Sequence, residues 1–154
     1  MRPPTWIEPG RLIAGRHPCA AGPERAAEAV HDLLTSGVTL FVDLTEEGEL
    51  EPYEELVPRS ARYLRFPIHD FTVPDPSTLT SVLDAIDAEI AAGGIPFVHC
   101  WAGCGRTGVV VGCWLVRHGT EQNEALDRIA RTRGPGCPQT VEQRLAILDW
   151  PSAT

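Results

Sequence analysis

Short apolar segments alternate along this chain with longer segments of helical periodicity, and no other feature of the sequence restricts the fold as strongly. The expected strands are short and rich in apolar or β-branched residues, at positions 6–7, 12–14, 38–42, 63–66 and 95–99. The expected helices repeat their apolar residues every three or four positions, at 23–37, 77–92, 107–118, 121–132 and 139–150. Ser77 is expected to cap the second of these helices. Strands that alternate with helices predict an α/β sandwich in which helices flank a mostly parallel central sheet.

The chain has the length of a single domain. Its 154 residues contain no internal repeat and no linker-like segment, so residues 1–154 are expected to form one unit. No apolar run approaches the roughly 20 residues of a membrane-spanning helix, and the N-terminus lacks the apolar stretch of a signal peptide. These features predict a soluble cytoplasmic protein, which is expected to be a monomer.

Cysteine usage and charge exclude several classes of site and partner. Five cysteines are an odd number in a chain without an export signal, which favours reduced thiols over a framework of disulfides. There is no CxxC or HxxxH pair, so no metal site is expected. The formal net charge of −8 disfavours nucleic acids and anionic membranes as partners, because both bind basic surfaces.

Residues 98–108, VHCWAGCGRTG, connect the last expected strand to the helix at 107–118. In a parallel α/β fold, the loop between the carboxyl end of a strand and the start of a helix is the usual ligand site. Gly103, Gly105 and Gly108 allow the backbone to turn tightly, so that successive N–H groups converge in front of the helix. With the helix dipole behind them, these groups predict a site for an oxyanion.

Two side chains of this loop suit the chemistry of a phosphate ester. The N–H groups and the helix N-terminus favour the thiolate of Cys100, and a thiolate beneath a bound phosphate can attack phosphorus in line to form a phosphocysteine. Arg106 offers a planar fork that matches two oxygens of a phosphoryl group. Thr107 can donate a hydrogen bond to Cys100 when that thiolate leaves. His99 is expected to order the loop by bonding to backbone carbonyls.

The same residues resemble a known family signature. His99, Cys100, Arg106 and Thr107 together match the HCX5R(S/T) pattern of the cysteine-dependent protein tyrosine phosphatases, and the short chain resembles their dual-specificity-like branch. The resemblance implies the fold of that family and a phosphocysteine mechanism without a cofactor. It also implies a cradle that binds the phosphate, formed by Trp101, Ala102, Gly103, Cys104, Gly105 and Arg106.

The resemblance further implies a general acid on a second loop, which protonates the leaving oxygen. Residues 66–71, FPIHDF, are similar to the P-I-x-D acid loop of small microbial members of the family. This similarity makes Asp70 the candidate for the acid. Asp75 lies in the same proline-rich segment and is the competing candidate.

A third segment, residues 133–143, resembles the R-P-G-x-x-Q-T-x-E-Q segment of such phosphatases, with glycine and proline exchanged. By this resemblance Gln139 contacts the catalytic pocket, whereas Gln143 is expected to be an ordinary helix residue. Arg131 and Arg133 could attract phosphate, but exposed arginines at a helix end are the more frequent arrangement.

Two further features each allow two interpretations. Cys104 is either a small packing residue or a second thiol that captures an oxidised Cys100 as a disulfide. The acidic residues Glu46, Glu47 and Glu49 follow the strand at 38–42, where one of them could hold Arg106. A solvated run of charges is the more frequent explanation for them, so they are not counted among the catalytic residues.

The sequence constrains the substrate less than the chemistry. The chain contains no lysine, and the variable loop positions Trp101, Ala102 and Cys104 are not basic, which disfavours polyanionic substrates. Trp101 could form an apolar wall for an aryl group. The sequence therefore favours a phosphatase of phosphotyrosine in proteins, with phosphoserine and phosphothreonine as further substrates. The alternatives are a phosphatase of a phosphorylated small molecule, a phosphoinositide or an RNA 5′ end, and a catalytically inactive phosphate-binding module.

Overall fold

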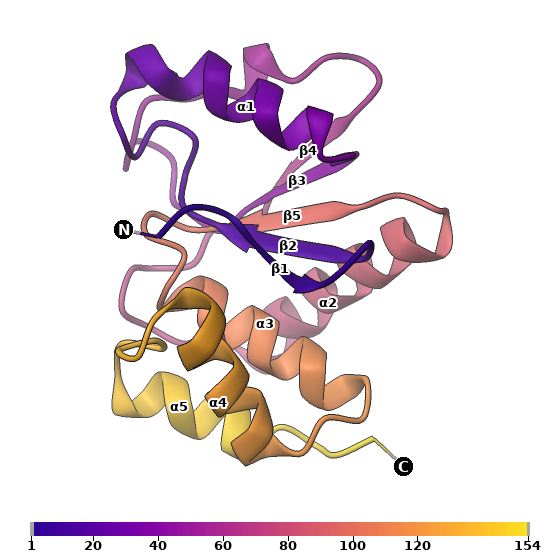
Figure 1. The fold of residues 1–154 in the computed structure, drawn as a ribbon. Coiled ribbons are helices and arrows are strands. Elements are labelled where there is room, and N and C mark those ends of the chain that lie inside the picture. The colour runs from indigo at the N-terminus through magenta and orange to yellow at the C-terminus, as the bar shows by residue number, and fades with distance from the viewer. Residues whose placement is uncertain (1, 154) are drawn as a thin grey trace.

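A computed structural model describes residues 2–153, and within them five strands form one sheet in the order β1-β2-β5-β3-β4 (Figure 1). The strands are β1 (Thr5–Glu8), β2 (Leu12–Gly15), β3 (Leu40–Asp43), β4 (Arg62–Arg65) and β5 (Pro96–His99). The pair β1–β2 is antiparallel, whereas β2–β5, β5–β3 and β3–β4 are parallel. This architecture confirms the mostly parallel α/β sheet that the sequence predicts.

Helices cover both faces of the sheet (Figure 1). They are α1 (Ala26–Thr35), α2 (Pro76–Ala91), α3 (Arg106–Arg117), α4 (Gln122–Arg133) and α5 (Val141–Leu148), with short 3-10 turns η1 (Pro23–Arg25) and η2 (Glu54–Leu56). Helix α1 lies on one face, and the other four helices lie on the opposite face. No helix within residues 2–153 is both long and apolar enough to cross a membrane.

Alternate residues of the strands enter two separate cores. Phe41 and Phe97 belong to the cluster on the α1 side, whereas Val42 and Val98 belong to the larger cluster on the side of α2 to α5. Each of these four residues is fully buried. Strands buried on both faces have near-continuous apolar sequences, as found here in β3 and β5.

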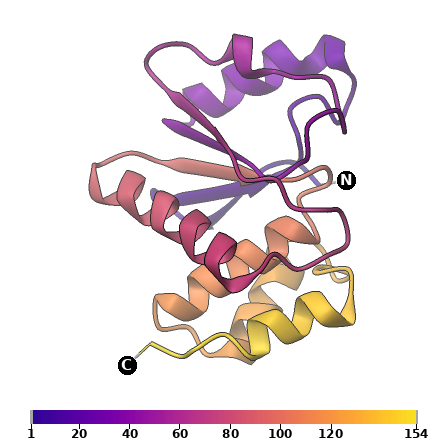
Figure 2. The same ribbon diagram turned by 180° about the vertical axis from the view of Figure 1, so that it is seen from behind.

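The carboxyl ends of the parallel strands meet at one edge of the sheet. The register pairs His99 at the end of β5 with Gly15 of β2 and with Asp43 of β3, and it pairs Asp43 with Arg65 of β4. The loops that follow these strands therefore begin side by side. Figure 2 shows the loop that leaves β4 running toward α2 on the same side of the molecule as α5.

Each of the five helices begins one to three residues away from the position that the sequence predicts, and for α2 and α5 the capping residue explains the difference. Asp75, not Ser77, caps α2, because its carboxylate accepts a hydrogen bond from the Thr78 amide at 2.8 Å and Pro76 can occupy the first helical position. Helix α5 begins at Val141, since Thr140 and Gln143 form a reciprocal capping box. Residue 139 consequently lies in the connection before α5.

Candidate active site

Residues 100–106, called the cysteine loop below, connect β5 to the N-terminus of α3. Cys100 follows the last residue of β5 and is only 3% exposed. The backbone amides of residues 101–105 donate no hydrogen bond to any group within residues 2–153. Gly103 has a φ of 71°, a value that glycine adopts without strain. A buried thiol thus lies beside several unpaired amides and the positive end of a helix dipole, an arrangement that binds anions.

Arg133 at the end of α4 holds the outer side of the cysteine loop. Its Nε donates to the Gly103 carbonyl at 2.8 Å and its Nη2 donates to the Ala102 carbonyl at 3.3 Å. Since C=O and N–H point in opposite directions across a trans peptide, these bonds turn the amides of Gly103 and Cys104 to the opposite side. Arg133 therefore helps to orient the amides that surround the thiol.

The prediction that Arg133 is an exposed arginine at a helix end is wrong. Arg133 is only 3% exposed, because the end of α4 packs against the cysteine loop. Burial lowers the pKa of Arg133 to about 10, although the negative charge of Cys100 favours its charged form. Arg131 does lie exposed at the helix end, where it pairs with Glu124 at 2.8 Å.

The guanidinium of Arg106 is held in one orientation by two other loops. Its Nη1 and Nη2 donate to the two carboxylate oxygens of Glu49 at 2.8 and 3.0 Å, and Nη1 also donates to the Ile68 carbonyl at 2.8 Å. Burial disfavours the charge of Arg106, but its bonds to Glu49 and the charges around it raise its pKa. Glu49 thus belongs to the site, and the sequence interpretation that left it in a solvated charge run is wrong.

Two buried donors at the start of α3 have no partner within the described residues. They are the Nε of Arg106 and the hydroxyl of Thr107. The expected hydrogen bond from Thr107 to Cys100 is therefore not formed in this structure. Because nearly all buried polar groups are paired, two unpaired donors beside a thiol and a row of unpaired amides form a site that an oxyanion can complete.

The structure brings Asp70 to the site and places Asp75 elsewhere. Oδ1 of Asp70 lies 3.2 Å from Nη2 of Arg106, and its side chain is 40% exposed. Asp75 caps α2, where it accepts hydrogen bonds from the Ser77 hydroxyl and the Thr78 amide, and these bonds lower its pKa. Of these two aspartates, Asp70 is therefore the one that lies beside Arg106.

His99, the last residue of β5, contacts the backbone at the start of the cysteine loop. Its Nδ1 lies 3.0 Å from the Cys100 carbonyl, and its Nε2 lies 2.6 Å from the Tyr53 hydroxyl. Burial lowers the pKa of His99, although the charge of Asp43 opposes this effect. A neutral ring with its proton on Nδ1 satisfies both contacts, since Nδ1 then donates to the carbonyl and Nε2 accepts from Tyr53.

Gln139 and Gln143 reach the cysteine loop from the connection between α4 and α5. A Cβ atom at Gly105 would collide with the side-chain oxygen of Gln139 and with the amide of Gln143, so a larger residue at this position would displace both side chains. Gln143 is fully buried and its Nε2 donates to the Thr72 carbonyl at 3.3 Å. Gln143 therefore joins three segments around the site and is more than the ordinary helix residue expected.

Cys104 forms a disulfide with Cys137 in the α4–α5 connection, with the two Cα atoms 5.0 Å apart. Both sequence interpretations of Cys104 are therefore wrong in this structure, because it is neither a free packing thiol nor paired with Cys100. The expectation of reduced thiols holds for Cys19, Cys100 and Cys113. No local pattern predicts this pair, because its two cysteines lie 33 positions apart in the chain.

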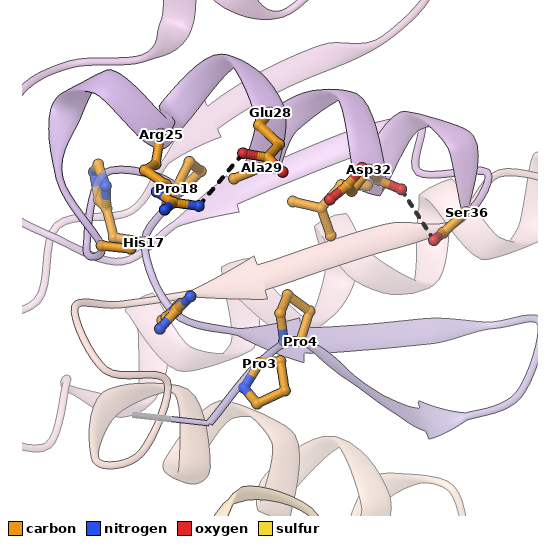
Figure 3. Close-up of a pocket in the computed structure, with 12 residues that line it drawn as sticks. Pro3, Pro4, His17, Pro18, Arg25, Glu28, Ala29, Asp32 and Ser36 are labelled. Carbon is orange, nitrogen blue, oxygen red and sulfur yellow. Dashed lines mark hydrogen bonds and ion pairs between the residues drawn. The ribbon is translucent and has the colours of Figure 1, made fainter.

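A pocket of about 370 Å³ lies next to the cysteine loop, between α1 and the N-terminal segment (Figure 3). It adjoins the loop at His17, whose amide donates to the Trp101 carbonyl at 2.8 Å. Its charged lining residues are Arg16, Arg25, Glu28 and Asp32. Their formal charges cancel, and neither Cys100 nor Arg106 lines the pocket, so it is separate from the candidate active site.

Most of the chain is similar to known phosphatases. Residues 1–144 match the model of the family described as "PTP-SAK: Swiss Army Knife protein, DSP-PTPase phosphatase domain". The chain is 29% identical over 134 residues to the tyrosine-protein phosphatase CDC14 homolog of Schizosaccharomyces pombe, covering 79% of this chain and 24% of that protein. It is 29% identical over 108 residues to the phosphatidylglycerophosphate phosphatase PTPMT1 of Arabidopsis thaliana, covering 65% of this chain and 32% of that protein.

The chain therefore spans a third or less of the length of these two relatives. The crystal structure of Tk-PTP in the active form superposes with a TM-score of 0.79 at 29% identity, covering 94% of this chain and 92% of that one. The family match extends over both the cysteine loop and the sheet that positions it. The chain belongs to the DSP-PTPase family of cysteine-based phosphatases.

Proposed function

We propose that this chain hydrolyses phosphotyrosine in proteins through a phosphocysteine intermediate. The observation that carries the proposal is the set of unpaired donors around Cys100, namely the amides of residues 101–105, the Nε of Arg106 and the Thr107 hydroxyl. A phosphate dianion would satisfy these donors, and their convergence would hold phosphorus above the sulfur.

In the first step, the thiolate of Cys100 attacks phosphorus and the bond from phosphorus to the ester oxygen breaks. Arg106, already fixed by Glu49, donates from its free Nε to a phosphoryl oxygen as charge develops there. Protonated Asp70 gives its proton to the leaving oxygen. Its position 3.2 Å from Arg106 supports this role.

In the second step, water attacks the phosphocysteine and the bond from sulfur to phosphorus breaks. Asp70, now ionised, accepts a proton from the water, and inorganic phosphate leaves. Gln139 lies against Gly105, where its side-chain amide can orient that water. The unpaired Thr107 hydroxyl can donate to the departing thiolate.

The surface around the site favours an aromatic phosphate ester. Trp101 follows the nucleophile and is 44% exposed, and Phe71 follows the acid and is 58% exposed. These two side chains offer apolar surface next to Cys100 and next to Asp70, which suits the ring of phosphotyrosine. Glu46 and Glu47 on the loop that also carries Glu49 add negative charge, which disfavours substrates with several phosphates.

A lipid phosphate is the second candidate substrate, because the chain is similar to PTPMT1 of Arabidopsis thaliana, named as a phosphatidylglycerophosphate phosphatase. Measurements of phosphate release distinguish a protein substrate from a lipid substrate. The substrates to compare are tyrosine-phosphorylated peptides, serine- and threonine-phosphorylated peptides, and phosphatidylglycerophosphate vesicles. We expect kcat/KM for the phosphotyrosine peptides to exceed the other values by at least tenfold. A higher value for the lipid would reject a protein substrate.

Asp70→Asn is expected to lower kcat about 100-fold with phenyl phosphate, because the phenolate then leaves without a proton. The loss with p-nitrophenyl phosphate should be much smaller, since that leaving group needs little protonation. Initial rates over a series of substituted phenyl phosphates measure this dependence. Asp75→Asn is the matched control and should leave kcat near its original value with both esters. An equal loss for all esters would exclude Asp70 as the acid.

A further inference from the structure

The cysteine loop is joined to the end of α4 and to the α4–α5 connection by one disulfide and by the contacts of two side chains. Arg133 donates to the carbonyls of Ala102 and Gly103, and the Gln139 side chain packs against Gly105. Between these contacts lies the disulfide of Cys104 with Cys137. Of the three, only the disulfide responds to the redox state of the surroundings.

The disulfide constrains the position of Gln139 relative to the cysteine loop. Cys137 precedes Gln139 by two residues, and Cys104 precedes Gly105, against which Gln139 packs. The covalent bond thus fixes the separation between the backbone that carries Gln139 and the backbone that surrounds the thiol. The bonds of Arg133 do not involve residue 139. The Gln139 amide donates to Gln143 of α5 at 3.0 Å, but Gln143 makes no hydrogen bond to the cysteine loop within the described residues, so neither side chain replaces the covalent constraint.

We propose that the Cys104–Cys137 disulfide is a redox-controlled brace, and that a dithiol reductant which opens it slows hydrolysis of the phosphocysteine. This inference rests on the proposed function. Cys104 is half-buried whereas Cys137 is 7% exposed, so a reductant reaches the Cys104 sulfur first. Cys100 is free in the braced form and keeps its role as nucleophile.

The redox step balances as a thiol–disulfide exchange. A thiolate of the dithiol attacks Sγ of Cys104, the bond between the two protein sulfurs breaks, and Cys137 leaves as a thiolate that takes up a proton. The second thiol of the reductant then attacks the mixed disulfide and releases Cys104 as a thiol. The protein gains two electrons and two protons, and the reductant becomes a disulfide.

Reduction should affect the second chemical step more than the first. Attack of Cys100 on the ester depends on Arg106 and on the loop amides, which Glu49 and Arg133 still hold after reduction. Hydrolysis also depends on water placed by Gln139. Because a misplacement of about 1 Å can cost about 100-fold in rate, we expect kcat to fall about tenfold. The ratio kcat/KM, which reports the first step, should change less than twofold.

The test compares the oxidised chain with the chain treated with dithiothreitol, using p-nitrophenyl phosphate. Mass spectrometry after alkylation confirms that Cys100 is a free thiol in both samples and that only the 104–137 pair differs. Rapid mixing should reveal a burst of p-nitrophenol from the reduced form, because phosphocysteine accumulates when its hydrolysis is slow. Hydrogen exchange of the Cys137, Gln139 and Thr140 amides, which donate to Gly134 and Gln143, should be faster after reduction.

Variants separate the brace from other effects of the reductant. Cys104→Ser and Cys137→Ser should both show the kinetics of the reduced form and should not respond to dithiothreitol. Cys19→Ser removes a thiol outside the site and should respond as the original chain does. Equal kcat values for both redox forms, with turnover intact, would overturn the inference. Absence of turnover in every form would reject the proposed function instead, while unchanged hydrogen exchange would independently reject the brace.

Discussion

Replacement of Cys100 by serine is expected to reduce turnover of any phosphate ester by about 10⁴-fold or more, the usual scale for loss of a covalent nucleophile. A serine hydroxyl is ionised far less readily than a thiol, so the unpaired amides of residues 101–105 would surround a poor nucleophile. The variant should nevertheless still bind the phosphate group of a substrate, because the donors expected to contact that group are unchanged. Initial rates with p-nitrophenyl phosphate and equilibrium binding of a phosphotyrosine peptide measure the two effects separately.

Cys113→Ser is the matched control for this prediction. Cys113 is also a free thiol and lies in the core on α3, away from the loop amides. Its replacement changes the stability of the core but should leave the rate per folded molecule close to the original. Turnover that persists in Cys100→Ser, with the melting temperature unchanged, would rule out the phosphocysteine mechanism.

Replacement of Arg106 by lysine is expected to lower kcat/KM by about 10³-fold, within the range seen when a donor to a developing oxyanion is lost. The ammonium keeps the positive charge that Glu49 and Asp70 face, so the fold is expected to persist. However, lysine cannot donate to Glu49 with two atoms and present a third donor to the phosphate at the same time. Steady-state kinetics with p-nitrophenyl phosphate, together with a thermal melt, measure this loss at known stability.

Glu49→Gln tests the other half of the same pair. The amide offers Arg106 one acceptor oxygen in place of two, so the guanidinium should be less well oriented while its charge remains. We expect a loss of about tenfold to 100-fold, clearly smaller than that of Arg106→Lys. A Glu49→Gln variant as slow as Arg106→Lys would indicate a direct role for the carboxylate in the reaction.

Much of the fold could be predicted because its signals are local. A strand or a helix is encoded by the spacing of apolar residues over 4 to 16 consecutive positions, and the alternation of these elements defines the fold class. The helix starts were less predictable, because they depend on which of several nearby polar residues accepts the first amides. Asp75 instead of Ser77 at α2 is the example.

The candidate site shows the same contrast between local features, which could be predicted, and long-range contacts, which could not. The cysteine loop could be predicted from the sequence alone, since Cys100, Gly103, Gly105 and Arg106 lie within seven consecutive residues that connect a strand directly to a helix. Its glycines and the helix behind it specify an anion site without help from the remainder of the chain.

The distant residues that complete this loop became evident only from the packing of whole elements. Glu49 lies 57 residues before Arg106, Arg133 lies 30 residues after Gly103, and Cys137 lies 33 residues after Cys104. In the sequence, these three residues lie in an acidic loop, a helix end and a turn. Such segments occur in many proteins without any role in a binding site, so they do not indicate one. They meet because the parallel register brings the carboxyl ends of the strands to one edge, and because α4 and α5 pack against α3 beside it. Such contacts depend on how whole elements pack, and no spacing within a single segment records them.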